Sequence, residues 1–311
     1  MYLAINKHTQ QSVALKVFTI NQLNQDYMLA IYEKELHILN MLPPSSSFIT
    51  LAAEPFNYTD SANSSKYVLP LRYASKGNLT NILKKEFLNE RHARYIFKQI
   101  LSAIELMHNS LIAHRDIKLD NILVDETNQI SLTDFGYAVC GQTPAFLKIG
   151  TVGYIAPEVY LNQRYDPFCA DIFSLGVVLF NMVTGENLLD DDDGPGNPIY
   201  KQLRNGSPSA FWKLLEKRCP RVKIMSIKLR MMLSSMLHPE PEKRSKLGSI
   251  KSHSWLKGDT ITPLEFSQWV GRVKNEDDTI YSHIVSPNEL YKFQGNWKIV
   301  SSILMGIWNY I

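Results

Sequence analysis

The sequence has 311 residues, of which 45 % are hydrophobic and 20 % are charged. These proportions are typical of a globular protein and exclude an intrinsically disordered chain. The 33 basic and 30 acidic residues give a net charge of +3, which is too small to indicate binding to nucleic acid or to an anionic membrane surface.

Three features of the sequence bear on where the protein acts. Cys140, Cys169 and Cys219 are far apart and form no CxxC pair, so we expect neither disulfides nor zinc, and a cytoplasmic (intracellular) location. We recognise no secretory signal in the first residues. The apolar stretch at 298–311 is shorter than the roughly 20 residues that a spanning helix needs, so no membrane span is expected.

The first quarter of the chain has the pattern of a small sheet with one helix. Residues 26–42 carry apolar side chains at helical spacing, and the run stops before Pro43. Pro70 lies inside a predicted strand and has no backbone N–H, so we expect it at a sheet edge or in a bulge. Apolar, largely β-branched runs predict strands at 2–6, 12–20, 48–57 and 67–71.

The remainder of the chain is predicted to be mostly helical. Residues 90–109 place apolar side chains on one face, whereas 169–185 is apolar nearly all round, which indicates a buried helix. Two short strands are expected between them, at 121–126 and 130–135. A further helix is predicted near 262–276, and beyond about residue 280 the sequence suggests no function.

The segment HRDIKLDN places chemically useful side chains at fixed offsets. Asp116, Lys118 and Asn121 lie within six residues, and Asp134 follows the next predicted strand. Phosphoryl transfer requires neutralised phosphate charge, a held magnesium ion and an aligned acceptor hydroxyl. Because magnesium prefers carboxylate and amide oxygens, this set of side chains fits that chemistry.

With these residues in place, the chain resembles the eukaryotic protein kinases, and the resemblance covers about residues 2 to 257. Each motif alone is weak evidence, but their order and spacing together are very specific. The motifs are VALK at 13–16, HRDIKLDN at 114–121, LTDFG at 132–136, GTVGYIAPE at 150–158, DIFSLGV at 171–177 and HPEPEKRSKLGSIKSHSWL at 238–256.

The resemblance implies an α+β, two-lobed protein kinase fold. Residues 1–71 would form a small, incomplete, β-rich N-lobe, and 72–78 would form the hinge. Residues 79–258 would form the helical C-lobe, followed by an extension at 259–311 of unknown role. The implied activity is transfer of the γ-phosphate of ATP to Ser or Thr hydroxyls of protein substrates, with ATP and Mg²⁺ as cofactors.

The resemblance also implies roles for the residues of the catalytic loop. Asp116 would accept or orient the proton of the substrate hydroxyl, and Lys118 would steady the transferring phosphoryl group. Asn121 and Asp134 would ligate magnesium. Lys118 together with Thr151 is similar to the pattern of the serine/threonine branch rather than that of tyrosine-directed kinases.

The nucleotide would be held by residues from both lobes. Lys16 would contact the α- and β-phosphates and pair with a glutamate of the first helix, for which Glu33 and Glu35 both compete; the family pattern favours Glu35. For the adenosine, the resemblance implies Leu71 as gatekeeper, Tyr73 and Ala74 in the hinge, Ala14 and Leu123 around adenine, and Asn78 near the ribose.

Two further motifs are expected to support the C-lobe. Arg244 would form a buried salt bridge with Glu158, and Asp171 would hold the catalytic loop by hydrogen bonds. Around Arg244 the chain is most similar to the calcium/calmodulin-dependent and energy-sensor kinases.

One departure from the pattern leaves an alternative open. The sequence contains no G-x-G-x-x-G phosphate loop, whose backbone amides would cover the nucleotide. Either the sequence is part of a longer protein, or the chain is a weak or inactive kinase. The alternative is therefore a pseudokinase that binds nucleotide or protein as a regulatory module. The oligomeric state is not indicated.

Overall fold

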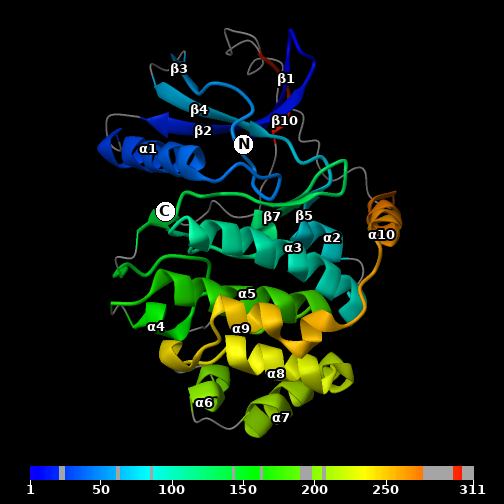
Figure 1. Cartoon of the computed structure of the whole chain (residues 1–311). Coiled ribbons are helices and arrows are strands. Elements are labelled where there is room, and N and C mark those ends of the chain that lie inside the picture. Colours follow the sequence, from blue (N-terminus) through cyan, green and yellow to red (C-terminus); the bar gives the residue numbers. More distant parts are fainter. Residues whose placement is uncertain are drawn as a thin grey trace.

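The structure is a computed structural model with two stacked lobes. The upper lobe consists of a sheet and one helix, and the lower lobe is mostly helical (Figure 1). This is the two-lobed architecture expected from the sequence. It describes residues 1–20, 25–60, 64–84, 87–141, 144–161, 164–189, 198–204, 208–275 and 297–302.

The N-lobe is an antiparallel five-stranded sheet with one helix packed against it. The strand order is β10-β1-β2-β4-β3, and α1 lies beside β2 (Figure 1). The buried centre of β1, at Ala4, and the buried inner face of α1 follow the apolar patterns of the sequence. The elements are β1 (Tyr2–Asn6), β2 (Ser12–Ile20), α1 (Gln25–Met41), β3 (Phe56–Thr59), β4 (Ser65–Arg72) and β10 (Trp297–Ser302).

The predicted strand at 48–57 is wrong for most of its length. Phe48 and Leu51 form only isolated bridges, and the regular strand β3 begins at Phe56. The physical reason is that the backbone between them is paired elsewhere: Ile49 N donates to Leu132 O at 2.8 Å, across the boundary between the lobes. An apolar run that links two lobes has the same sequence pattern as a strand within one sheet.

Pro70 causes no bulge in β4. Its pairing with Leu15 of β2 continues the ladder without a register shift. Pro70 lies beyond the end of β3, and its carbonyl accepts a hydrogen bond from Ala52 N at 2.8 Å. The missing N–H therefore costs no ladder bond with β2. Because β4 has neighbours on both sides at Pro70, the expectation of an edge position or a bulge was wrong.

Strand β10 comes from the C-terminal region, for which the sequence suggested no function. It pairs antiparallel with β1, from Tyr2 opposite Ser302 to Asn6 opposite Trp297. The register shifts once, between Leu3 and Ala4. Two segments almost 300 residues apart in sequence therefore share one edge of the N-lobe sheet.

The C-lobe is organised around two long helices, α3 and α5. Asn89 caps α3, and Asp166 followed by a proline starts α5. Gly185 ends α5 with a φ of 72°, a left-handed conformation that favours glycine. The helices are α2 (Leu79–Leu83), α3 (Glu90–Asn109), α4 (Pro157–Tyr160), α5 (Pro167–Thr184), α6 (Pro198–Arg204), α7 (Pro208–Arg218), α8 (Ile227–Met236), α9 (Leu247–Ser252) and α10 (Pro263–Asn275).

Short strands and 3₁₀ turns complete the C-lobe. The strands β5-β7-β8 make one small sheet, and β6 pairs with β9. The elements are β5 (Gly77–Asn78), β6 (Ile112–Ala113), β7 (Ile122–Val124), β8 (Ile130–Leu132), β9 (Val139–Cys140), and 3₁₀ turns at Leu119–Asn121, Pro220–Ile224, Pro241–Lys243 and Ser254–Lys257.

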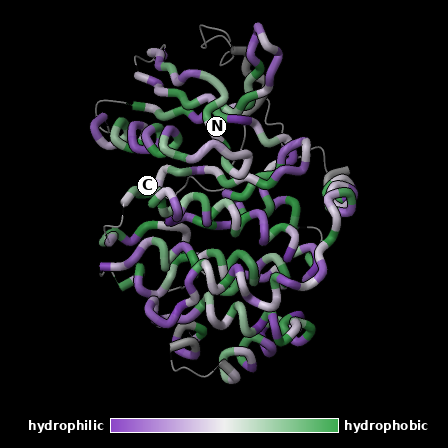
Figure 2. The backbone as a smooth tube through the Cα atoms, viewed as in Figure 1, coloured by the Kyte–Doolittle hydropathy of each residue, from purple (hydrophilic) through white to green (hydrophobic). Residues whose placement is uncertain are grey.

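The hydrophobic core of the C-lobe surrounds α5. Many residues of the central helices are hydrophobic, whereas hydrophobic and hydrophilic residues alternate along α1 in the N-lobe (Figure 2). Within the described part of the chain, α5 is the one helix long and apolar enough to cross a membrane, and 89 % of its apolar window is buried inside the protein. Phe266 and Trp269 of α10 pack against the C-lobe, with Phe266 5.0 Å from Tyr95 between ring centroids.

Candidate active site

Four distant segments meet where the two lobes face each other. Lys16 comes from β2, Glu35 from α1 and Asp134 from the turn after β8. The loop at 114–121 lies on the C-lobe side, between β6 and β7. The structure thus brings together the charged residues that the sequence motifs singled out.

Lys16 is the centre of the upper half of the site. Its Nζ lies 2.7 and 2.6 Å from the two carboxylate oxygens of Glu35 and 2.8 Å from Asp134 Oδ1. Both Lys16 and Glu35 are buried, at 8 % and 1 % exposure. Glu33 is exposed on the same helix, so the structure confirms Glu35 as the partner of Lys16.

The electrostatics of this group keep Lys16 and Asp134 charged. Burial alone would lower the pKa of Lys16, but the neighbouring Asp134 and Glu35 raise it above its ordinary value. Burial alone would raise the pKa of Asp134, but Lys16 outweighs burial and lowers it. The ammonium group is therefore held in place by two acidic side chains from different lobes.

Asp116 is the centre of the lower half of the site. Its Oδ1 accepts a hydrogen bond from the Thr151 hydroxyl at 2.6 Å, and Lys118 Nζ lies 3.0 Å from its Oδ2. Lys118 also donates to the Thr151 hydroxyl at 2.6 Å. Asn121 Nδ2 donates to the backbone oxygen and to Oδ2 of Asp116, at 2.9 and 3.1 Å. These bonds fix the carboxylate and connect it to the GTVGY segment.

The backbone of the catalytic loop is anchored by Asp171 of α5. Its carboxylate, which is fully buried, accepts hydrogen bonds from the backbone N–H groups of His114 and Arg115, each at 2.8 Å. His108 Nε2 lies 3.0 Å from the same carboxylate. Arg115 has a φ of 65°, an uncommon conformation for a residue other than glycine, and these bonds stabilise it. The expected role of Asp171 is confirmed.

The predicted salt bridge below the site is also present. Arg244 donates to Glu158 through both terminal nitrogens, at 2.6 and 2.9 Å. Arg244 also donates to the backbone oxygens of His238 and Cys169, at 3.0 and 2.8 Å. This buried group fixes the end of the GTVGYIAPE segment on the C-lobe.

The residues assigned to adenosine lie in two paired sets. Ala14 and Leu71 are opposite each other in β2 and β4, and both are buried. Asn78 and Leu123 are opposite each other in β5 and β7. Asn78 is the N-cap of α2, and its side-chain oxygen accepts from Asn81 N at 2.9 Å. The structure thus gives Asn78 a structural role in addition to the predicted contact with ribose.

Tyr73 and Ala74 lie in the segment that joins these two sets. Ala74 is buried and Tyr73 is partly buried. The segment from Arg72 to Asn78 therefore connects the N-lobe wall to the C-lobe wall, as a hinge would.

Asn121 and Asp134 fit a magnesium site that is completed by a nucleotide. They supply the amide and carboxylate oxygens that Mg²⁺ prefers. Among the residues that the structure describes, no group of three His, Cys, Asp or Glu side chains could form a self-sufficient metal site. Magnesium usually takes one or two protein ligands and completes its coordination with phosphate oxygens and water.

Comparison with known proteins identifies the family. The family model described as "Protein kinase domain" matches residues 1–256. This chain belongs to the protein kinase domain family. It is 32 % identical over 262 residues to CBL-interacting serine/threonine-protein kinase 12 of Arabidopsis thaliana, covering 83 % of this chain and 50 % of that protein.

Other kinases match to a similar extent. The identity to the carbon catabolite-derepressing protein kinase of Secale cereale is 31 % over 260 residues, covering 82 % of this chain and 48 % of that protein. CBL-interacting protein kinase 22 of Oryza sativa is 35 % identical over 210 residues, covering 64 % of this chain and 44 % of that protein. The chain spans about half the length of the curated relatives it matches.

Sequence reasoning missed two features of this kinase domain. The first is the direct bond between Lys16 and Asp134, which no spacing along the chain predicts. The second is Arg72, assigned only to the hinge, whose side chain makes four hydrogen bonds. For Arg72, the only signal in the sequence was a positively charged residue directly after an apolar strand.

Proposed function

We propose that this chain is a serine/threonine protein kinase that transfers the γ-phosphate of ATP to Ser or Thr hydroxyls of protein substrates. The observation that carries the proposal is the assembled Lys16 group, in which one buried ammonium contacts Glu35 and Asp134. Three segments that are far apart in the sequence therefore meet at the Lys16 ammonium group, and the loop that carries Asp116 lies on the opposite side of the site.

The catalytic step follows from the positions of Asp116 and Lys118. Asp116 accepts or orients the proton of the attacking hydroxyl, because its carboxylate is buried and fixed by Asn121 and Thr151. Lys118 supplies positive charge within 3.0 Å of that carboxylate and steadies the transferring phosphoryl group. Positioned acid–base assistance of this kind contributes about 10²–10⁴-fold to the rate.

ATP and magnesium are the cofactors that the family uses. Asn121 and Asp134 would hold the metal ion, which neutralises phosphate charge when bound. Lys16 would contact the α- and β-phosphates. The adenine would lie between Ala14 and Leu123, with the further contacts of Leu71, Tyr73, Ala74 and Asn78 named above.

The choice of acceptor is supported by the loop geometry and by the relatives. The Thr151 hydroxyl bridges Lys118 and Asp116, so the pair that resembles the serine/threonine branch is connected in space. Two of the relatives reported above carry "protein kinase" in their names, and a third is named a serine/threonine-protein kinase. We further propose a cytoplasmic location, which is supported by three free cysteines.

A phosphotransfer assay tests the proposal. We expect Mg²⁺-dependent transfer from ATP to a generic protein substrate, and a fall in kcat of about 10²–10⁴-fold in Asp116→Asn. ATP binding measured by titration calorimetry should change little in that variant. The control is Asp259→Asn, an exposed carboxylate outside the site. Transfer that is equal in Asp116→Asn and Asp259→Asn would contradict the assignment of Asp116, and absent transfer in the unchanged chain would favour the pseudokinase.

A further inference from the structure

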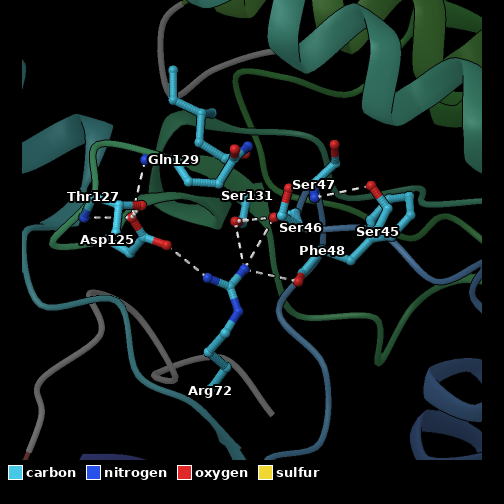
Figure 3. A network of polar contacts seen from close by, with 10 residues as sticks. Ser45, Ser46, Ser47, Phe48, Arg72, Asp125, Thr127, Gln129 and Ser131 are labelled. Carbon is cyan, nitrogen blue, oxygen red and sulfur yellow. Dashed lines mark hydrogen bonds and ion pairs between the residues drawn. The ribbon is translucent and has the colours of Figure 1, made fainter.

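Arg72 lies at the end of β4, where the N-lobe sheet passes into the hinge, and its guanidinium contacts three segments (Figure 3). One terminal nitrogen donates to Asp125 Oδ2 at 2.8 Å. The other donates to Ser131 Oγ at 2.7 Å and to the backbone oxygens of Ser46 and Phe48, at 3.1 and 3.0 Å. A planar guanidinium suits this geometry because its donors are fixed in direction.

On the C-lobe side of this contact, Asp125 is held by hydrogen bonds that do not involve Arg72. The Oδ1 of Asp125 accepts from Thr127 N, the Thr127 hydroxyl and Gln129 N, at 2.9, 2.7 and 3.0 Å (Figure 3). Asp125 therefore closes the turn between β7 and β8 with one oxygen and offers the other to Arg72. Its side chain is 9 % exposed, and Ser131 is buried.

The N-lobe side is the segment between α1 and β3. Ser46 O accepts a second hydrogen bond from Ser131 Oγ at 2.7 Å. The backbone of this segment is bonded to β8 through Leu132 N to Ser47 O at 2.8 Å, and to β4 through Arg72 N to Thr50 O at 2.9 Å. Arg72 thus ties β4, the segment at 46–50 and the β7–β8 turn into one polar cluster.

The cluster is continuous with both walls of the proposed adenine site. Arg72 directly follows Leu71, which is paired with Ala14 on the N-lobe wall. Asp125 lies two residues after Leu123, the C-lobe wall, and alternate residues of an extended segment share a face. The contact between Arg72 and Asp125 therefore links the segment that carries Leu71 to the segment that carries Leu123.

From this arrangement we infer that Arg72 is a positioning residue for nucleotide binding, one that sets the separation of the two adenine walls without contacting the phosphates. The inference rests on the proposed kinase function, because it assigns the adenine site between these walls. Removal of the Arg72 guanidinium leaves the Asp125 carboxylate, which is largely shielded from water, without its ion-pair partner and with only the electrostatic attraction of Lys76. The hinge and the segment at 46–50 then lose the side-chain bonds from Arg72 to the backbone oxygens of Ser46 and Phe48.

The test combines backbone exchange with kinetics in the full chain. Hydrogen exchange followed by mass spectrometry reports residues 46–50 and 72–78 without requiring activity, with α5 as internal reference. In Arg72→Met we expect exchange of these two segments to increase about tenfold, and KM for ATP to rise about tenfold, the factor for one net charge-assisted hydrogen bond. KM for the protein substrate should stay within about twofold. Arg72→Lys, which keeps the charge but not the fork, should be intermediate.

The matched control is Lys66→Met on the same strand. Lys66 bonds Thr19 at 2.9 Å and lies 3.3 Å from Asp60, so its ion pair stays within the N-lobe. The inference is overturned if exchange at 72–78 is the same in the Arg72 and Lys66 variants, or if the two KM values rise together. If Arg72→Met does not fold, Arg72→Lys decides by the same criteria. If the unchanged chain shows no transfer, the proposed function fails, and exchange together with the Kd of Mg-ATP decides the role of Arg72.

Discussion

At the scale of single residues, the site depends on opposite charges that stabilise one another. Lys16 contacts two carboxylates, of which Glu35 is buried and Asp134 is partly exposed. Such a group is costly to break singly, because the remaining charge has no partner in a low-dielectric environment. The same contacts determine how the stability of the protein depends on pH.

The lowered pKa of Asp134 predicts the direction of that dependence. A carboxyl group whose pKa is lower in the folded state contributes stability above its unfolded pKa of about 3.9, and loses it as the pH falls. Lys16, whose pKa is raised, contributes below about pH 10 and loses it at higher pH. We therefore expect Asp134→Asn to be less stable than the unchanged chain by about 1.5–3 kcal/mol between about pH 5 and 9.

Thermal unfolding at a series of pH values measures this difference. The gap in Tm between the unchanged chain and Asp134→Asn should narrow as the pH falls from 5 towards 3. A gap that is constant over this range would show that Asp134 is not held charged by Lys16.

The sequence could predict those site residues whose type and spacing along the chain are characteristic. Asp116, Asn121 and Asp134 were found from fixed offsets between polar residues. Asn78 shows the limit of that approach, since its side chain also caps α2. The cluster around Arg72 was not predictable, because its partners Ser46 and Asp125 are ordinary surface residue types whose proximity arises only in the folded chain.

At the scale of elements, regular periodicity was sufficient for the long helices and for β1 and β2. It failed at residues 48–57, because the apolar pattern records burial but not the partner that the backbone bonds. It gave no account of β10, since pairing with β1 joins segments at opposite ends of the sequence. Strand partners are non-local, and a single sequence carries little information about them.

Strand β10 covers an edge of the N-lobe sheet that would otherwise expose unpaired backbone groups of β1. Ile299 is opposite Ala4 in the register. We expect Ile299→Pro to lower the Tm by about 2–4 °C, because proline lacks the N–H and its ring fits a paired strand poorly. Ile299→Val, which keeps the backbone N–H at the same position, is the control. Equal Tm values for the two variants would contradict the pairing.

At the scale of the whole molecule, the two lobes contribute different halves of one chemistry. The N-lobe carries Lys16 and Glu35, and the C-lobe carries Asp116, Asn121 and Asp134. Asp171 and Arg244 add buried support in the C-lobe, where they hold the catalytic loop and the GTVGYIAPE segment. The fold class could be predicted from the sequence because the motifs occur along most of the chain in the order that is typical of protein kinases.

The central claim is that this site transfers the γ-phosphate of ATP to a Ser or Thr hydroxyl. The most direct measurement supplies ATP labelled at either the α- or the γ-phosphate with Mg²⁺ and a protein substrate, then hydrolyses the product and identifies the labelled amino acid. The account predicts label in phosphoserine or phosphothreonine from γ-labelled ATP only, and a rate of labelling about 10²–10⁴-fold lower with Asp116→Asn. Label from α-labelled ATP, label in phosphotyrosine alone, or no label in the presence of Mg²⁺ would contradict it.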